Sequence, residues 1–207
     1  MNEKNIIINV GRQLGSGGRL VARRLADMFG CEFYDRELLN LAAEESGFSK
    51  KFFEQNDEKK GFFKSIFSLR VPYFADNGFY DNKLSQESLF RFQSEAIRKA
   101  AEKGSCVFVG RCADYVLRDF KNTVNIFITA DIEERVSRIC ERRNCSRDEA
   151  LKIIEHGEAS RSSYYNYYTG KRWGDSSSYD LCINSSILGI DGTAEFVKEF
   201  IGRKNRQ

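Results

Sequence analysis

Proline, histidine and tryptophan are nearly absent from the sequence, with one residue of each among 207. The single proline, with 41% hydrophobic and 30% charged residues, excludes a proline-rich or disordered chain and indicates one folded globular domain. His156 is the only histidine, and Cys140 and Cys145 near it do not complete a zinc motif. We therefore interpret His156 as a surface or packing residue and predict no metal site made of protein side chains.

Long hydrophobic runs and closely spaced cysteine pairs are missing as well. The first apolar run, "NIIINV" at residues 5–10, is much shorter than the roughly 20 residues that span a bilayer, and no small-residue cleavage site follows it. The six cysteines are scattered without a CxxC pair, which predicts reduced thiols in a cytoplasmic protein. A net charge of +3 is too small to require an anionic polymer or surface. We expect neither nucleic acid nor a membrane as a partner.

The apolar residues of the chain follow two alternating patterns. Short apolar runs bounded by turn residues predict five strands, at residues 5–10, 31–34, 106–110, 123–130 and 180–186. Helical periodicity predicts helices that begin after the glycines at 15–18, near Ser85, at Asp131, at the capping box "SRDE" (146–149) and near Asp191. The helix from 146 is expected to continue past Arg161. Strands that alternate with helices are typical of a doubly wound parallel sheet, which binds ligands beyond the carboxyl ends of its strands.

Two stretches do not fit this alternation. Residues 48–83 are rich in phenylalanine, which indicates an insertion packed on its own core or on a second subunit, and is consistent with a homodimer; a membrane-surface helix is the alternative. Residues 155–179 mix Tyr, Ser, Arg, Lys, Gly and Trp and have the composition of a loop or lid hinged on helices. Their aromatic and basic residues could also stack on single-stranded nucleic acid, which the small net charge disfavours.

A glycine-rich turn, "GSGG" at residues 15–18, lies between the first predicted strand and the first helix. This context suits phosphate binding, because glycines let backbone N–H groups converge and a helix N-terminus favours an anion. The P-loop pattern GxxxxGK[ST] would place its lysine at Gly18 and its hydroxyl at Arg19. Arg12 or Arg19 would have to supply the missing charge, and Mg²⁺ would lose its usual hydroxyl ligand. A turn without any ligand is the alternative.

Further motifs follow this turn along the chain: "FYDRELL", "FVGRCADYVL", "ERRNCSRDEA", "EASRSSYY" and "YDLCINSS". With the glycine turn, and from near residue 6 to near residue 201, they resemble the cytidylate kinase-like branch of the nucleoside monophosphate kinases. The resemblance implies that the turn binds the ATP phosphates, through Gly15, Ser16, Gly17, Gly18 and Arg19, with Arg12 beside them. It implies that Asp35 and Arg111 bind the acceptor, Arg111 as part of a Gly-Arg-Asp motif. Cys112 replaces the Asp of that motif, and Asp114 is the carboxylate that could compensate for it.

The same resemblance makes the region after residue 141 a lid that closes over the transferring phosphoryl group. Arg138 and Arg142 lie four residues apart and project from one helix face, which the family uses to contact the ATP base and phosphates. Arg161, in "EASR", matches a lid arginine that bridges donor and acceptor phosphates, and Glu158 stands where the family more often has Asp. The candidate catalytic residues are thus Arg111, Arg142 and Arg161; surface ion pairs or a solvated helix face are the alternative for each.

Taken together, the resemblance implies a three-layer α/β/α P-loop kinase fold with a five-stranded parallel sheet, a helical insertion and a lid. One domain, 1–207, would consist of a core (1–35, 104–141 and 180–207), a helical acceptor-binding insertion (36–103) and a lid (142–179). The implied activity is phosphoryl transfer from ATP to a small phosphorylated acceptor, a nucleoside monophosphate such as CMP, with Mg²⁺ bound through phosphates and water. A nucleotide-binding regulator impaired in catalysis, and a kinase of a different small molecule, are the alternatives.

Overall fold

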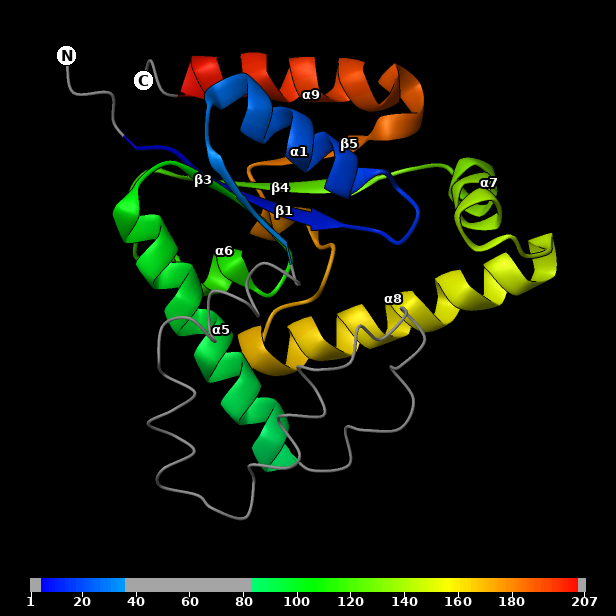
Figure 1. Ribbon diagram of the computed structural model, residues 1–207, viewed down its shortest axis with the longest axis horizontal. Coiled ribbons are helices and arrows are strands. Elements are labelled where there is room, and N and C mark those ends of the chain that lie inside the picture. The colour runs from blue at the N-terminus through cyan, green and yellow to red at the C-terminus, as the bar shows by residue number, and fades with distance from the viewer. Residues whose placement is uncertain (1–4, 36–82, 205–207) are drawn as a thin grey trace.

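The computed structural model describes residues 5–35 and 83–204 of the chain. Its strands are β1 (Ile7–Arg12), β2 (Glu32–Tyr34), β3 (Cys106–Val109), β4 (Thr123–Thr129) and β5 (Leu181–Asn184). They form one parallel sheet in the order β2-β3-β1-β4-β5 (Figure 1). The five strands predicted from apolar runs are confirmed, with ends that differ by one or two residues.

The central strand of the sheet is β1, whose apolar residues are buried on both faces. Residues 7–10 pair with residues 106–109 of β3, and residues 7–12 pair with residues 123–128 of β4. Ile8 and Val10 enter one hydrophobic core and Ile7 enters another on the opposite face, as the two-residue period of a strand requires. A continuous apolar run is what a strand covered on both sides needs.

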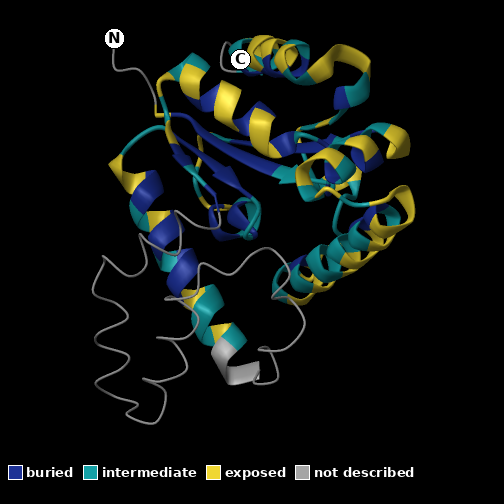
Figure 2. Ribbon diagram, turned by 45° about the vertical axis from the view of Figure 1, so that its right-hand side comes forward, coloured by how far each residue is buried: buried dark blue, intermediate teal, exposed yellow. Residues whose placement is uncertain are grey.

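Helices cover both faces of the sheet and make three layers. α1 (Gly18–Phe29) and α9 (Ser185–Lys204) pack on each other and on one face, while α5 (Lys83–Lys103) and α6 (Ala113–Val116) cover the other (Figure 1). The buried residues line the sheet and the helix faces turned toward it (Figure 2). Because the loops after β1 and β3 lead to helices on opposite faces, their carboxyl ends diverge and form the switch point where such sheets bind ligands.

The last helix begins earlier than the expected start near Asp191. α9 starts at Ser185, and the Asn184 side chain accepts a hydrogen bond from the Ser186 N–H at 2.9 Å in its first turn. Gly189, with φ 66° and ψ −179°, then breaks the helix two residues before Asp191. Only glycine adopts this backbone conformation readily, so the expected start corresponds to the part of α9 after the break.

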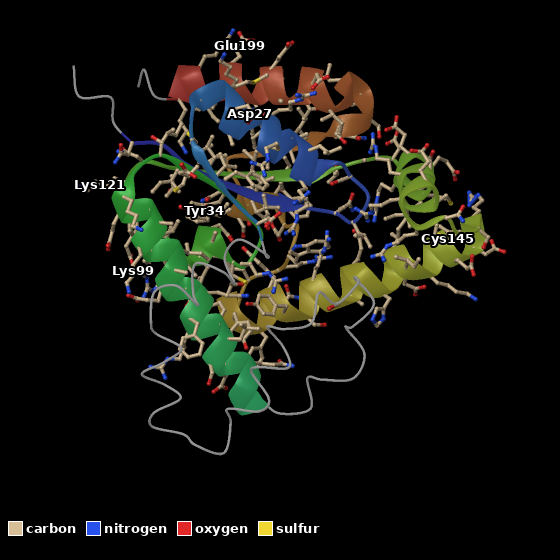
Figure 3. The ribbon with its side chains drawn as sticks, viewed as in Figure 1. Asp27, Tyr34, Lys99, Lys121, Cys145 and Glu199 are labelled. Atoms are coloured by element: carbon tan, nitrogen blue, oxygen red, sulfur yellow. The ribbon has the colours of Figure 1, made fainter. Side chains whose placement is uncertain are left out.

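A pair of helices, α7 (Ile132–Arg143) and α8 (Arg147–Thr169), extends from the carboxyl end of β4. The predicted capping box is confirmed: the Glu149 N–H donates to Ser146 Oγ and the Ser146 N–H donates to a Glu149 carboxylate oxygen. As expected, α8 continues past Arg161; it ends at Thr169, so the loop composition of residues 155–179 corresponds to a loop only after that residue, and the lid role stays a prediction. α8 runs beneath the sheet in Figure 1, and Cys145 marks the turn that joins α7 to it (Figure 3).

The phenylalanine-rich stretch 48–83 lies outside the described residues except for Lys83. Within the described ranges, no helix is both long enough and apolar enough to cross a membrane.

Candidate active site

The glycine loop between β1 and α1 has the backbone that the sequence predicts for a phosphate cradle. Gly15 and Gly17 have φ of 81° and 76°, which glycine adopts without the Cβ penalty of other residues. Within the described part of the chain, the N–H groups of Gly15, Gly17 and Arg19 make no hydrogen bond. Unpaired N–H donors at a helix N-terminus are groups of the kind that bind phosphate in proteins.

Ser16 contributes its backbone to this loop and not its hydroxyl. The residue is fully buried, and its Oγ donates to the Gln13 carbonyl at 2.9 Å and accepts from the Gly18 N–H at 3.3 Å. The Ser185 hydroxyl in turn donates to the Ser16 carbonyl at 2.6 Å. The serine side chain therefore braces the loop from within, and the predicted role of Ser16 rests on its main chain.

Arg12, the last residue of β1, crosses from the glycine loop to the end of β3. A Cβ on Gly110 would lie 1.9 Å from Arg12 Nη1, so a side chain there would displace the guanidinium from its position. The backbone carbonyl of Arg12 accepts a hydrogen bond from Arg161 Nη1 at 3.0 Å. β1, β3 and α8 thus place Arg12 and Arg161 together at the switch point of the sheet.

Arg19, in the first turn of α1, reaches the end of β2. Its Nε and Nη2 donate to Asp35 Oδ2 at 2.9 and 2.5 Å, and Asp35 is only 6% exposed. The pair joins the glycine loop to the segment for which we predict acceptor binding. Of the two arginines considered in place of the loop lysine, Arg19 pairs with Asp35 at the end of β2, and Arg12 lies at the junction of β1 and β3.

The turn after β3 holds three consecutive left-handed residues. Gly110, Arg111 and Cys112 have φ of 72°, 58° and 56°, a conformation that strains the two non-glycine residues by about 1–3 kcal/mol each and often occurs at functional sites. The Arg111 guanidinium lies 5.0 Å from the ring centre of Tyr164 in α8. Its Nε is buried without a hydrogen-bond partner among the described residues. A buried, unused guanidinium donor at a strand end suits an anionic ligand.

Of the two residues near Arg111 that bear on acceptor recognition, Cys112 is buried and Asp114 is partly buried. Cys112 is 2% exposed, and burial raises the pKa of its thiol to about 12, so it stays neutral and cannot replace a carboxylate at physiological pH. Asp114 accepts a hydrogen bond from the Tyr165 hydroxyl at 2.7 Å. Burial raises the pKa of Asp114, and the Tyr165 hydrogen bond offsets part of this effect.

The predicted arginines of α7 differ in their position relative to the loop. Arg138 donates from Nη1 to the Gly15 carbonyl at 3.1 Å and pairs with Glu134 on its own helix. Arg142 is exposed one turn further along α7. The sequence did not predict two contacts at this site. Arg135 is buried and donates to the Leu14 carbonyl, and the Tyr164 ring lies against the Arg111 guanidinium. Neither has a sequence signal, because an arginine on a basic helix or a tyrosine in a tyrosine-rich segment looks the same whether buried or exposed.

The side chains that the structure describes at this site do not form a binding set for Mg²⁺. Among the residues that the structure describes, no three His, Cys, Asp or Glu side chains group together. Arg19 stands at the hydroxyl position of the P-loop pattern, and the nearby Ser16 hydroxyl is turned inward. The donor set of amides and guanidiniums suits phosphate oxygens instead.

The strand order, with a glycine loop after the central strand, defines the protein as having a P-loop kinase fold. Shikimate kinase from Bacteroides thetaiotaomicron shares this fold, with a TM-score of 0.53 and 12% identity over 96% of this chain and 99% of that one. The chain belongs to the cytidylate kinase-like family, whose model matches residues 7–187, and its class is therefore that of kinases.

Two relatives match nearly the whole chain. A cytidylate kinase from Methanopyrus kandleri is 27% identical over 205 residues, which cover 95% of this chain and 93% of the relative. An uncharacterized protein from Eubacterium ventriosum, whose crystal structure is known, is 32% identical with a TM-score of 0.74 and covers 97% of this chain and 99% of that one. The expected family and fold are thus confirmed.

Proposed function

We propose that the protein transfers the γ-phosphoryl group of ATP to a nucleoside monophosphate, with CMP as the first candidate. The observations that support this proposal are that Arg161 contacts Arg12, and that Arg12 reaches the strand end which Arg111 follows, beside the glycine loop. Arg161 donates to the Arg12 carbonyl, and the Arg12 guanidinium lies over Gly110, the residue before Arg111. Guanidiniums from β1, the turn after β3 and α8 suit a site where two phosphate groups approach each other.

In this proposal the chain supplies positioning and positive charge, which are the main requirements of phosphoryl transfer. The unpaired N–H groups of Gly15, Gly17 and Arg19 bind the β-phosphate. Arg12 takes the place of the absent loop lysine, because its guanidinium lies at the switch point. Arg111 anchors the acceptor phosphate through its free donor, and Arg161 neutralises the charge that develops between donor and acceptor. Mg²⁺ would arrive on the phosphates of ATP, where it neutralises part of their charge.

The choice of CMP rests on the family and on the names of relatives such as the Methanopyrus kandleri cytidylate kinase. Cys112, neutral and buried, cannot accept a charge-assisted hydrogen bond from the amino group of cytosine. Purified protein should therefore be assayed with Mg²⁺-ATP against CMP, dCMP, UMP, AMP and shikimate, with ADP release as the readout. Turnover fastest with CMP supports the proposal. Turnover of another acceptor corrects the substrate, and ATP binding without any turnover supports a nucleotide-binding regulator instead.

Arg161→Ala tests the proposed catalytic role of the α8 arginine. Because a guanidinium that meets charge formed in the transition state acts on the chemical step, we expect kcat to fall by at least about 100-fold and the Kd of ATP to change little. Arg147→Ala is the control and should retain activity. It removes an exposed arginine in the first turn of α8, which pairs with Glu133 of α7. Equal losses in ATP binding and turnover for Arg161→Ala would contradict the role.

A further inference from the structure

Leu14, the residue before the first glycine of the loop, is held at both backbone groups by side chains of α7 and α8. Its N–H donates to Glu158 Oε1 at 3.1 Å, and its carbonyl accepts from Arg135 Nε at 2.9 Å. Arg135 Nη2 lies 2.8 Å from the same Glu158 oxygen. The two side chains and the Leu14 backbone therefore form a closed ring that joins the loop to both helices.

This ring contains an ion pair between a buried arginine and a partly buried glutamate. The Arg135 side chain is 7% exposed and that of Glu158 is 24% exposed. Burial of charged groups is unfavourable, and an apolar pair of the same size often stabilises a fold equally well. A buried pair that also hydrogen-bonds a loop backbone is better explained by fixing the geometry of that loop than by stability.

The Leu14 side chain is anchored independently of the ion pair. It is 2% exposed and packs with Val136, Ile139, Ala150 and Ile154 in a small core between α7 and α8. Gly157, in the middle of α8, provides the space, because a Cβ there would lie 2.6 Å from Leu14 Cδ2. Packing and polar contacts thus hold the same residue.

The neighbouring carbonyls of the loop are bound in the same way. Arg138 donates to the Gly15 carbonyl and Arg161 donates to the Arg12 carbonyl. In a trans peptide the C=O and the following N–H point in opposite directions. Fixing the Leu14 carbonyl toward Arg135 therefore turns the Gly15 N–H away from α7, and this N–H is one of the three unpaired donors of the loop.

We propose that Glu158 and Arg135 are positioning residues for the phosphate-binding loop. They hold the Leu14 peptide in the orientation that presents the Gly15 N–H to the ATP phosphate, and they join the loop to α8, which carries Arg161. The expected effect of these residues on ATP binding and turnover rests on the proposed function, whereas their effect on the conformation of the loop does not.

The test measures the loop without nucleotide and the activity with it. Hydrogen exchange of the Leu14 amide is followed by NMR in the full chain for wild type, Glu158→Gln and Glu158→Ala, because exchange reports local opening. Glu155→Ala, which removes an exposed carboxylate one turn earlier on α8, is the matched control. We expect exchange about tenfold or more faster in Glu158→Ala, an intermediate rate in Glu158→Gln, which keeps an acceptor oxygen, and no change in Glu155→Ala.

We expect kcat/KM for ATP to fall by about 10- to 100-fold in Glu158→Ala, mainly through KM, with partial recovery in Glu158→Gln.

Removal of Glu158 alone leaves Arg135 buried without its counter-charge, so Glu158→Ala could fail to fold. The double variant Arg135→Met with Glu158→Leu removes both charges and should fold while losing the protection of Leu14 and the affinity for ATP. Unchanged Leu14 protection in the folded variants would overturn the proposal, and so would unchanged ATP affinity despite faster exchange. A wild-type protein that binds no ATP would refute the proposed function, while the exchange measurement would still decide whether the two residues hold the loop.

Discussion

At the residue scale, Asp114 shows how burial changes an ionisable group. Its carboxylate accepts the Tyr165 hydroxyl, yet burial raises its pKa above the ordinary value of 3.8. The folded protein therefore binds this proton more tightly than the unfolded chain does. The protonated Asp114 carboxyl therefore contributes to stability in full below the pKa it has in the unfolded chain. This contribution is lost as the pH rises through its higher pKa in the folded protein.

Asp114→Asn should remove this pH dependence, because the amide cannot ionise and its oxygen still accepts from Tyr165. The difference in stability between the variant and wild type should therefore favour the variant more at pH 7.5 than at a pH below 4. Thermal unfolding measured from pH 3.5 to 8 checks this, with Asp119→Asn as an exposed control on the same segment. Parallel curves for wild type and Asp114→Asn would show that the carboxyl has the same pKa in the folded and unfolded states.

The choice between Arg12 and Arg19 as the loop cation is also a question of single residues. Arg12 lies at the ends of β1 and β3, whereas the Arg19 side chain is 62% exposed and paired with Asp35. A charged hydrogen bond contributes about 1.5–3 kcal/mol, so Arg12→Ala should weaken ATP binding by about 10- to 100-fold. Arg19→Ala should change the Kd of ATP by about twofold or less. Calorimetric titration with ATP measures both, and the reverse ranking would assign the role to Arg19.

The sequence indicates which arginines lie near strand ends and the glycine loop, but not how they pair, and their functional roles stay predictions. Arg12, Arg19, Arg111 and Arg161 follow from their places at strand ends and in family motifs. The pairing of Arg135 with Glu158 joins residues 23 positions apart on two helices, and no local spacing predicts such a contact. The same is true of Tyr164 over Arg111.

At the element scale, Gly157 is the unusual residue of α8. Replacing glycine by alanine inside a helix ordinarily stabilises it by up to about 1 kcal/mol. In α8, however, the new Cβ would lie 2.6 Å from Leu14 Cδ2, and overpacking of this kind destabilises by about 1–3 kcal/mol.

Gly157→Ala should therefore lower the free energy of unfolding, and Gly202→Ala should raise it. Gly202 lies in α9, and a Cβ there would meet no atom of the described residues within 4 Å. Chemical denaturation measures the free energy of unfolding of each variant, so the same glycine-to-alanine change is compared at the two positions. A stabilising Gly157→Ala would mean that Leu14 moves aside without loss.

The elements themselves were predicted well where local chemistry decides them. The capping box at 146–149 and the strands of apolar residues were confirmed. The helix from 146 was expected to continue past Arg161, but its tyrosine and serine content resembles a loop, so its end at Thr169 could not be predicted. Contacts of Tyr164 with Arg111 and of Tyr165 with Asp114 help to hold this segment against the residues that follow β3. Tertiary contacts of this kind outweigh helix propensity.

At the scale of the whole molecule, ligand binding should stabilise the fold. ATP at about 100 times its Kd adds about 2.7 kcal/mol, and a protein of this size gains about 2–4 °C in Tm per kcal/mol. We expect Mg²⁺-ATP to raise Tm by about 5–10 °C and CMP added with it to raise Tm further. A thermal shift series with ATP, CMP and both together checks this. No shift with any nucleotide would mean that the glycine loop is only a turn.

The arrangement of the sheet could be predicted only in part. Alternating strands and helices indicate a parallel sheet, but the order β2-β3-β1-β4-β5 depends on pairings between distant residues, and it was the family resemblance that pointed to this fold. The division into core, insertion and lid stays a prediction. Most of the proposed insertion lies outside the described residues, and α8 runs under the sheet as a continuous helix.

The central position of β1 also determines when the sheet can form during synthesis. Ile7 pairs with Cys106, which is 99 positions later, so a ribosome that adds about 5–20 residues per second makes the first partner strand roughly 5–20 seconds after β1. Its isoleucine run has no sheet to join in that interval. We expect the emerging chain to depend on chaperones to keep this strand from aggregating, and the purified protein to refold slowly for its length.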